Sequence, residues 1–321
     1  VWITSCNSPD YTLPNVTGKA GEVVLVIEDN DWNSDVGIKL REVFLEEYPE
    51  LPQSEPCFDL VNIPVKAFTS IFKTHRNLVL LDISSKHDRA SVKAKQNVYA
   101  RPQTVVTIAA PDRAAAASLL AEKKVFLQDL IANAERQRII ENYKTYEVRS
   151  LREDLEKKHH LSLYFPKGYS PGPDSLQFVW ITYETPITSQ GVFVYYYEYT
   201  DTNIFNLDTL INIRDSVLKN FVPGPLPNTY MQTERENDRP VFTEYYLNGR
   251  YIAEIRGLWR VEGDYMGGPF ISFSTVDEKR NRVVTVEGYV YAPKYEKRNY
   301  LRQVEAILHT LAFPDEENNK E

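Results

Sequence analysis

A long run without glycine or proline constrains this chain more than any other feature, because it extends from Asp112 to His160. Within the run, apolar side chains recur close to helical spacing, at Leu119, Phe126, Leu130, Ala134, Ile140, Tyr143, Leu151 and Leu155. A single helix of this length would measure about 70 Å, which is longer than one domain needs. β-branched and aromatic residues lower helix propensity at Thr145-Tyr146. The run therefore predicts two helices with a break near Thr145, and it places a domain junction in this region.

The residues ahead of this run alternate between compact apolar stretches and amphipathic ones. The apolar stretches predict strands at residues 22–27, 58–63, 77–83 and 105–109. The amphipathic stretches predict helices at residues 36–48, where Pro49 ends the pattern, and at residues 65–72. Strands that alternate with helices are typical of an α/β arrangement with short crossovers.

After Leu161 the sequence is dominated by strand patterns. Strands are predicted at residues 161–165, 177–183, 191–199, 241–247, 251–261, 270–276 and 282–291. Helices are predicted at residues 207–221 and 300–311, and Asn248-Gly249 predicts a tight hairpin turn. We therefore expect an α+β fold with two α/β sandwich-like domains joined by a long helical segment. The C-terminal half is expected to be a mainly antiparallel sheet with helices.

The strand at residues 191–199 carries an aromatic stripe formed by Phe193, Tyr195, Tyr197 and Tyr199. Its other side is also largely apolar, which favours a central strand that is covered on both faces. On this interpretation Tyr195 belongs to the core. The alternative is an exposed platform that binds a sugar or a protein, since aromatic side chains also supply interface area.

The N-terminus suggests how the chain reaches a membrane. Ile3-Thr4-Ser5-Cys6 resembles the lipobox of bacterial lipoproteins, in which the cysteine is lipidated after the signal peptide is removed. The polar residues 7–20 would then form a flexible tether. The alternative is a free cysteine in a tail. With Cys6 lipidated, Cys57 has no disulfide partner, and we expect it to be a buried, inert thiol.

The composition limits the classes of partner. Lys and Arg number 37 against 45 Asp and Glu, which gives a net charge of −8. This balance argues against nucleic-acid binding and against attachment to an anionic membrane by charge alone. No apolar run approaches the roughly 20 residues of a membrane-spanning helix. Membrane attachment would therefore depend on the lipid at Cys6.

Three motifs in the sequence resemble sites of chemistry. The alternating Asp29, Asp31, Asn33 and Asp35 resemble a calcium loop, but Ser34 and Leu40 replace the Gly and Glu that an EF-hand needs. Helix capping by Ser34 or Asp35 explains the same pattern. The G-x-S-x-G match at residues 168–172 is rejected, because Pro171 has no N–H to donate to an oxyanion. His159 and His160 are adjacent without a metal-ligand motif. We predict no metal, no cofactor and no catalytic residue.

Five residues remain as candidate ligand-binding residues: Asp29, Asp31, Trp32, His75 and Arg76. They follow or precede predicted strands, and they include the acid, base and aromatic side chains that recognition sites use.

Further stretches carry a family resemblance. They are Leu51-Pro52-Gln53-Ser54-Glu55-Pro56, Phe58, Phe68, Phe72, Arg76-Asn77, Gly268-Pro269-Phe270 and Glu287-Gly288-Tyr289-Val290-Tyr291-Ala292-Pro293. Together they resemble an uncharacterised family of Bacteroidota lipoproteins, a domain of unknown function. The resemblance implies no reaction. Separately, the order of elements from Leu161 to Leu311, with Phe165-Pro166-Lys167-Gly168-Tyr169, is similar to PsbP/Mog1-like α/β sandwiches, which implies protein binding.

The expected organisation has four parts. Residues 1–20 hold the signal-peptide remnant, lipobox and tether, 21–158 the N-terminal α/β domain, 159–313 the C-terminal antiparallel α+β domain and 314–321 an acidic tail. The expected function is that of a cell-envelope lipoprotein that faces the periplasm, on the outer or inner membrane, and binds an envelope protein or cell-wall polymer without catalysis. The alternative is an envelope hydrolase or metal-dependent enzyme that acts on cell-wall or glycan material.

Overall fold

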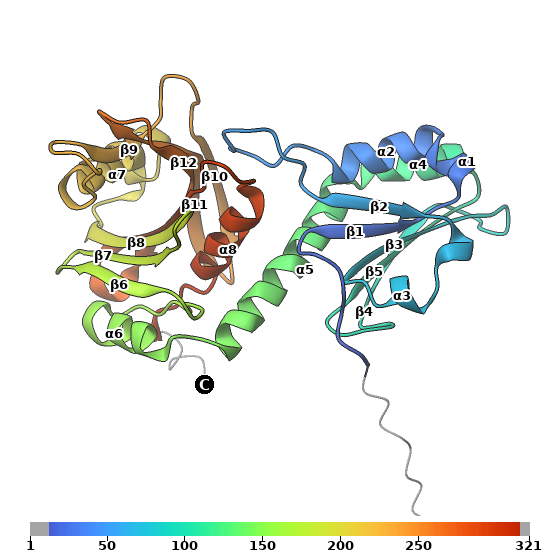
Figure 1. The fold of residues 1–321 in the computed structure, drawn as a ribbon, viewed down its shortest axis with the longest axis horizontal. Coiled ribbons are helices and arrows are strands. Elements are labelled where there is room, and N and C mark those ends of the chain that lie inside the picture. Colours follow the sequence, from blue (N-terminus) through green and yellow to red (C-terminus); the bar gives the residue numbers. More distant parts are fainter. Residues whose placement is uncertain (1–12, 315–321) are drawn as a thin grey trace, which may run out of the picture. The chain divides into compact units, whose positions relative to one another are not determined.

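A computed structural model of the chain describes residues 13–314 (Figure 1). The lipobox with Cys6 and the end of the acidic tail lie outside the described residues. The chain divides into two compact units. The first comprises residues 1–46 and 56–135, and the second comprises residues 47–55 and 136–321. The expected domain ranges were 21–158 and 159–313. They placed the domain boundary later along the helical run, and they assigned residues 47–55 to the N-terminal domain.

The first unit contains a five-stranded sheet in the order β2-β1-β3-β5-β4. Its strands are β1 (Glu22–Val26), β2 (Asp59–Ile63), β3 (Asn77–Ile83), β4 (Ser91–Gln96) and β5 (Thr104–Ala110). Strands β2, β1, β3 and β5 run parallel, and β4 is antiparallel to β5. Parallel neighbours require crossover connections, so the alternation of strands and helices in the sequence produces this arrangement.

Both faces of this sheet are covered. One face packs against helices α2 (Asp35–Phe44) and α4 (Arg113–Glu122) through a core that includes Val23, Leu25 and Leu120. The opposite face packs Val24, Val26 and Leu78 against the segment that holds η1 (Val65–Ala67) and α3 (Ser70–Lys73). Successive residues of β1 therefore bury on opposite sides, as the pleat of a strand requires.

The helical run consists of three helices. Helix α4 is followed by α5 (Lys124–Thr145) and α6 (Arg149–His159). The break predicted near Thr145-Tyr146 is confirmed. A further break at Lys123, where the backbone leaves helical geometry, was not predicted.

The second unit contains an eight-stranded sheet in the order β10-β11-β12-β13-β8-β7-β6, with β9 also paired to β11. Its strands are β6 (Ser170–Asp174), β7 (Phe178–Glu184), β8 (Ser189–Glu198), β9 (Tyr230–Thr233), β10 (Val241–Leu247), β11 (Arg250–Glu262), β12 (Gly267–Asp277) and β13 (Arg282–Tyr291). All pairings are antiparallel. Asn248 and Gly249 turn the predicted hairpin with positive φ angles of 52° and 80°.

Helices cover both faces of this second sheet. Helix α8 (Arg298–Leu308) lies in the concave side and α7 (Leu207–Phe221) lies on the other side (Figure 1). Strand β8 is central, between β13 and β7. Its Phe193 and Tyr195 face the α7 core, and Val192 and Val194 face the α8 core. The prediction that Tyr195 belongs to the core is confirmed, because it is 3% exposed.

The arm formed by residues 47–55 belongs to the second unit. The Glu55 carboxylate accepts hydrogen bonds from the backbone N–H groups of Lys297 and Arg298, at 2.6 and 2.9 Å. These are donors at the start of α8 that have no partner within the helix. The hydroxyl of Tyr48 donates to the Glu305 carboxylate at 3.1 Å. The arm thus caps α8 from a distant part of the sequence.

The mixed α+β fold and its two-domain layout are confirmed, and the differences are local. Residues 161–165 were predicted to form a strand, but they make only an isolated bridge from Ser162 to Ala312. Three short strands, β4, β6 and β9, were not predicted. Strand β6 has the sequence Ser-Pro-Gly-Pro-Asp, which is read as a loop because proline cannot donate to a strand ladder, and it is tolerated here because β6 is an edge strand.

Candidate functional site

Asp29, Asp31 and Trp32 lie in the short helix α1 (Asp29–Trp32), beyond the carboxyl end of β1. The Asp31 carboxylate accepts a hydrogen bond from Arg113 Nε at 2.6 Å. The guanidinium of Arg41 lies 4.4 Å from the centre of the Trp32 ring. Ser34 caps α2 through a bond from the N–H of Val36, which confirms the capping interpretation. These polar side chains therefore bind one another at the start of α2.

His75 and Arg76 lie at the other edge of the same sheet, directly before β3. His75 Nδ1 is 3.1 Å from the Glu22 carboxylate, and Arg76 Nε is 2.9 Å from the Glu135 carboxylate. Because β1 and β3 run parallel, the amino end of β3 and the carboxyl end of β1 are at opposite edges. The structure does not bring the five candidate residues together.

Glu135 explains why Arg76 is held at this edge. It is 2% exposed, and its carboxylate also accepts bonds from the Asn77 side-chain amide at 2.6 Å and from the Gly21 N–H at 3.3 Å. Burying a carboxylate costs free energy unless opposite charges and hydrogen-bond donors replace its hydration. Glu135 lies in α5, so this cluster connects α5 to the amino ends of β1 and β3. Its primary role is structural.

Within residues 13–314, no group of three or more His, Cys, Asp or Glu side chains is placed to hold a metal ion. Cys57 is half-buried, whereas full burial was expected.

The aromatic pocket is a cavity of about 590 Å³ in the second unit. Its aromatic wall consists of Trp180, Trp259, Tyr289, Tyr291 and Tyr295, and the remaining wall includes Ile187, Met231, Met266, Val261 and the Pro223-Gly224-Pro225 loop. This size and this apolar lining are typical of sites that hold small organic groups.

The wall of the aromatic pocket is fixed from within the sheet. Gly191 and Tyr289 are paired across β8 and β13, and a Cβ at Gly191 would overlap the Tyr289 ring. The ring therefore lies flat over the glycine, where it stacks on Phe193 at 5.0 Å between centroids. The Trp180 indole N–H donates to the Tyr289 hydroxyl at 3.2 Å, and burial raises the pKa of Tyr289 to about 12.

The mouth of the aromatic pocket exposes apolar groups. Ile187, at the tip of the β7–β8 hairpin, is 54% exposed, and Tyr295 is 42% exposed. The charged residues that line the pocket are Glu184 and Lys294, and the Glu184 carboxylate accepts a bond from the Ser189 hydroxyl at 2.7 Å. The lining contains no His, Asp or Cys, so it offers flat apolar contact rather than an acid–base pair.

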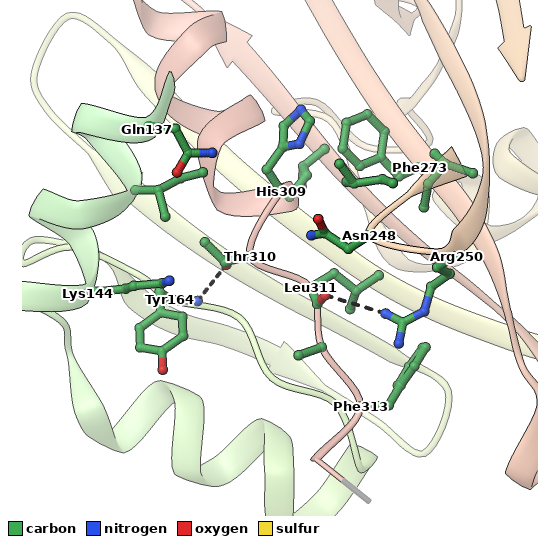
Figure 2. Close-up of a pocket in the computed structure, with 15 residues that line it drawn as sticks. Gln137, Lys144, Tyr164, Asn248, Arg250, Phe273, His309, Thr310, Leu311 and Phe313 are labelled. Carbon is green, nitrogen blue, oxygen red and sulfur yellow. Dashed lines mark hydrogen bonds between the residues drawn. The ribbon is translucent and has the colours of Figure 1, made fainter. Parts of the chain in front are cut away.

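The cationic pocket is a second cavity, of about 410 Å³, in the same unit (Figure 2). It lies between α5, the β10–β11 hairpin and the chain that follows α8. Its charged or titratable residues are Lys144, Tyr164, Arg250 and His309. Apolar side chains, among them Ile252, Phe273, Leu308 and Phe313, form the rest of its wall.

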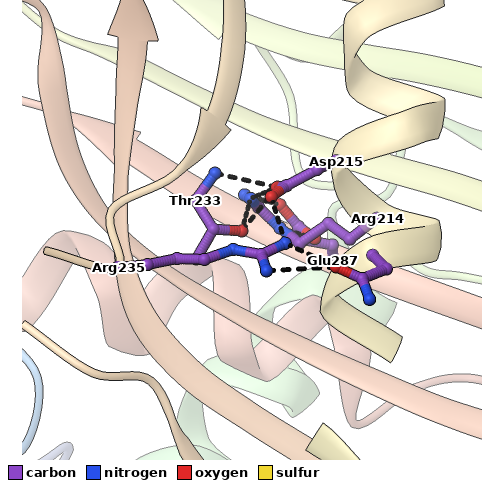
Figure 3. Close-up of polar contacts among 6 residues, drawn as sticks. Arg214, Asp215, Thr233, Arg235 and Glu287 are labelled. Atoms are coloured by element: carbon purple, nitrogen blue, oxygen red, sulfur yellow. Dashed lines mark hydrogen bonds and ion pairs between the residues drawn. The ribbon is translucent and has the colours of Figure 1, made fainter. Parts of the chain in front are cut away.

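Inside the second unit, Arg214 of α7 forms a buried ion pair with Glu287 of β13 (Figure 3). Two guanidinium nitrogens bind the two carboxylate oxygens at 2.8 and 2.7 Å, and both side chains are about 1% exposed or less. The guanidinium also lies 3.8 Å from the Phe270 ring centre, and it donates to the Thr233 hydroxyl at 2.7 Å. Burial raises the pKa of Glu287, and Arg214 opposes that shift.

A second buried cluster surrounds Glu305 of α8. Its carboxylate contacts Arg136 at 3.0 Å, Arg256 at 2.9 Å and His309 at 3.6 Å. Burial opposes the ionisation of Glu305, but Arg256, assisted by His309 and Arg136, outweighs it and holds the pKa of Glu305 well below its usual range. Burial lowers the pKa of His309 below 6.5, although Glu305 opposes this.

Sequence reasoning missed these buried charges, although a signal was present. Arg214 lies on the apolar face of α7, in line with Leu210, Ile211 and Leu218. Glu287 lies in β13, a strand that is otherwise mostly apolar. A charged side chain on a buried face requires a partner of opposite charge, so Arg214 and Glu287 could have been proposed as an ion pair from the sequence. No local pattern indicated the two pockets, because their walls come from separate segments.

Comparison with protein families gives two matches. The profile of a domain of unknown function, DUF4837, matches residues 148–310, which is half of the chain. The chain belongs to this family. A second domain of unknown function, DUF8532, matches residues 16–144. The DUF4837 match covers the antiparallel sheet, the aromatic pocket and the Arg214–Glu287 pair, but it leaves out Lys144 and other residues of the cationic pocket. The DUF8532 match covers the sheet of the first unit. The expectation of an uncharacterised family is confirmed.

Solved structures resemble this DUF4837 protein only weakly. A protein of Bacteroides thetaiotaomicron gives a TM-score of 0.28 at 9% identity, covering 49% of this chain and 46% of its own. LpqN, described as involved in cell envelope biogenesis of Mycobacterium tuberculosis, gives a TM-score of 0.28 at 13% sequence identity, and the match covers 47% of this chain and 83% of LpqN. The lipid transfer and protein localization domain of human StarD13 gives a TM-score of 0.23 at 8% sequence identity, and the match covers 51% of this chain and 95% of that domain. The chain spans about half the length of the first. Scores this low carry no argument about function.

Among curated proteins no sequence matches this DUF4837 chain. None of the helices within residues 13–314 is both long enough and apolar enough to cross a membrane.

Proposed function

We propose that this protein is a lipid-anchored cell-envelope protein with a binding or assembly role and no catalysis. In this proposal the aromatic pocket of the second unit holds a segment of an envelope protein or of a cell-wall polymer. The observation that carries the proposal is the composition of that pocket, in which aromatic and aliphatic walls surround a single Glu and a single Lys.

The chemistry of the pocket supports recognition. Tryptophan and tyrosine supply large contact areas at small conformational cost, and their faces stack on sugar rings and on proline or aliphatic side chains. Trp259 and Tyr289 are buried and support the wall from behind, Trp180 and Tyr291 are partly exposed, and Ile187 and Tyr295 are exposed at the mouth. A wall that is already in place costs little to order on binding.

The anchor in this proposal is Cys6, and the expected location is the periplasmic side of the outer or inner membrane. The support is the likeness of Ile3-Thr4-Ser5-Cys6 to a lipobox and the Bacteroidota lipoprotein resemblance of the sequence. In cells that make the full precursor, Cys6→Ala is expected to move the protein from the membrane to the soluble envelope fraction. Unchanged membrane association would contradict the anchor.

The binding role is tested with an exposed substitution at the pocket mouth. Ile187→Asp places a charge at the tip of the β7–β8 hairpin, where Ile187 is exposed and no core contact is lost. The matched control is Leu176→Asp, at the tip of the neighbouring β6–β7 hairpin, where the side chain is 89% exposed. Both variants are expected to melt at the temperature of the parent protein.

Binding is measured in two arms: cosedimentation with purified peptidoglycan, and crosslinked capture of envelope proteins with the anchor intact. We expect Ile187→Asp to reduce the signal in one arm by about tenfold or more, which corresponds to about 1.4 kcal/mol. Leu176→Asp is expected to leave it unchanged. Equal signals from both variants and the parent, in both arms, would contradict the proposed role of the pocket.

A further inference from the structure

The cationic pocket differs from the rest of the chain in its charge. The chain as a whole carries more acids than bases, with a net charge of −8. Among the described residues that line this pocket there is no Asp and no Glu, while Lys144 and Arg250 are both present. An acid-free cavity with two cations attracts anions, and low-dielectric walls strengthen that attraction.

The two cations approach the cavity from separate elements. Figure 2 shows Lys144 of α5 and Arg250 of β11 on opposite sides of it. The Lys144 ammonium lies 5.9 Å from the Tyr164 ring centre. The Arg250 guanidinium lies 4.3 Å from the Phe313 ring centre and donates to the Leu311 carbonyl at 3.4 Å. Both side chains are therefore positioned by aromatic rings.

The remaining residues that line the cationic pocket are of two kinds, polar and apolar. Gln137, Asn248 and Thr310 supply amide and hydroxyl groups, and Thr310 already accepts a bond from the Tyr164 N–H at 3.0 Å. Leu247 and Leu311, which are partly exposed, supply an apolar surface, and the buried Phe273 and Ile252 lie behind it. The Phe273 ring is held edge-to-face against His309, with centroids 5.1 Å apart. A ligand that is complementary to the cations and to the apolar residues has an anionic head and an apolar body.

We propose that the cationic pocket binds a small amphipathic organic anion, whose carboxylate or phosphate head is attracted by Lys144 and Arg250 and whose hydrocarbon part lies against Leu247 and Leu311. The volume of about 410 Å³ fits a molecule of this kind. This site is separate from the aromatic pocket, and the two cavities share no lining residue.

The probes form a matched series with one hydrocarbon chain and different heads: octanoate, octyl phosphate, octanol and octylammonium. Binding to the full chain is measured by isothermal titration calorimetry. We expect octanoate or octyl phosphate to bind about tenfold or more tightly than octanol, and octylammonium to bind most weakly. The first two probes distinguish a carboxylate head from a phosphate head. Octanol or octylammonium binding as tightly as both anions would overturn the proposal.

Variants locate the binding. Lys144→Met removes an exposed ammonium, and the matched control is Lys219→Met, whose ammonium lies over the Tyr230 ring at 5.1 Å outside the cavity. We expect Lys144→Met to raise the Kd of the preferred anion about tenfold, in line with the loss of a charge-assisted bond. Lys144→Arg is expected to retain binding, and Lys219→Met is expected to leave it unchanged.

A last variant separates this site from the proposed function. Ile187→Asp alters the aromatic pocket only, so anion binding is expected to persist in it. Anion binding that is lost in Ile187→Asp but unaffected by Lys144→Met would overturn the assignment to the cationic pocket, whatever the outcome for peptidoglycan or envelope proteins.

Discussion

The two units differ in where their ion pairs lie relative to the sheet. In the first unit the charged residues near the strand ends pair with one another, as Asp31 does with Arg113 and Arg76 with Glu135. In the second unit a full ion pair, Arg214 with Glu287, is buried between helix and sheet, while aromatic residues line an open cavity. The polar residues that the sequence offered as candidate sites in the first unit therefore form structural contacts.

The largest expected effect tests the difference between buried and exposed pairs. Arg214→Met leaves the Glu287 carboxylate buried without its partner, and we expect the free energy of unfolding to fall by about 3–5 kcal/mol. Arg113→Met removes the partner of Asp31 where the Arg113 side chain is 55% exposed, and an exposed pair of this kind contributes about 1 kcal/mol or less. Urea denaturation measures both.

The double variant Arg214→Met/Glu287→Leu serves as the control for Arg214→Met. Removing both charges is expected to recover much of the lost stability, because no unpaired charge stays buried. A double variant as unstable as Arg214→Met would show that packing around Phe270, rather than charge, dominates at this position.

A second prediction concerns the aromatic stripe of β8. Tyr195→Ala truncates a side chain packed between the sheet and α7, and we expect a loss of about 3–5 kcal/mol. Tyr197, farther along the same face, is only partly buried, so Tyr197→Ala should cost less. Thermal melts compare the two. A melting temperature for Tyr195→Ala equal to that of the parent would mean that this face is a free surface.

The arm at residues 47–55 gives a smaller effect. Glu55→Ala removes the carboxylate that caps α8, and we expect a loss of about 2 kcal/mol, as for charge-assisted bonds to buried donors. Ser54→Ala is the neighbouring control, since its hydroxyl bonds the exposed Glu47. Hydrogen exchange of the first turn of α8 should rise in Glu55→Ala alone; equal exchange in both variants would mean that the arm does not stabilise α8.

The smallest expected effect is a pH dependence. Because burial lowers the pKa of His309 in the folded protein, the unfolded chain binds a proton first as the pH falls below 6.5. Stability is therefore fully present above that pH and declines below it, by at most about 1.4 kcal/mol per pH unit. His309→Gln is expected to flatten the decline between pH 6.5 and the lower folded pKa. An identical slope in the variant would remove His309 as its source.

Glu305 acts in a lower pH range. Its pKa is held well below the ordinary value of 4.5, so its contribution is present above that pH and is lost as the pH falls further. The two groups can therefore be separated by the pH at which stability changes.

Local periodicity predicted much of the fold. Strands β1 and β3 carry compact apolar runs, β8 carries aromatic residues at alternate positions, and Asn248-Gly249 supplies turn residues. None of these signals needs a distant partner to be recognised. Strand β4 was missed because its sequence, Ser-Val-Lys-Ala-Lys-Gln, is polar, as suits an edge strand that avoids pairing with other chains. Such a strand has no apolar pattern to detect.

The candidate sites could not be predicted in the same way. Trp180 and Tyr289 meet through the pairing of three strands, and Lys144 and Arg250 meet through a helix and a hairpin. Glu55 and Lys297 lie far apart in the sequence. Sequence periodicity fixes which face of an element is apolar, but strand order decides which faces meet. The polar residues chosen from the sequence were placed correctly near strand ends, yet at opposite edges of one sheet.

The most direct test of the account compares binding after one substitution in the second unit and two in the first. Ile187→Asp alters the aromatic pocket of the second unit, and Asp31→Ala and His75→Ala alter the two edges of the first sheet. Cosedimentation with peptidoglycan and capture of envelope proteins are measured for each. The account predicts that binding is lost in Ile187→Asp and kept in Asp31→Ala and His75→Ala. Binding that survives Ile187→Asp but is lost in Asp31→Ala or His75→Ala would contradict it.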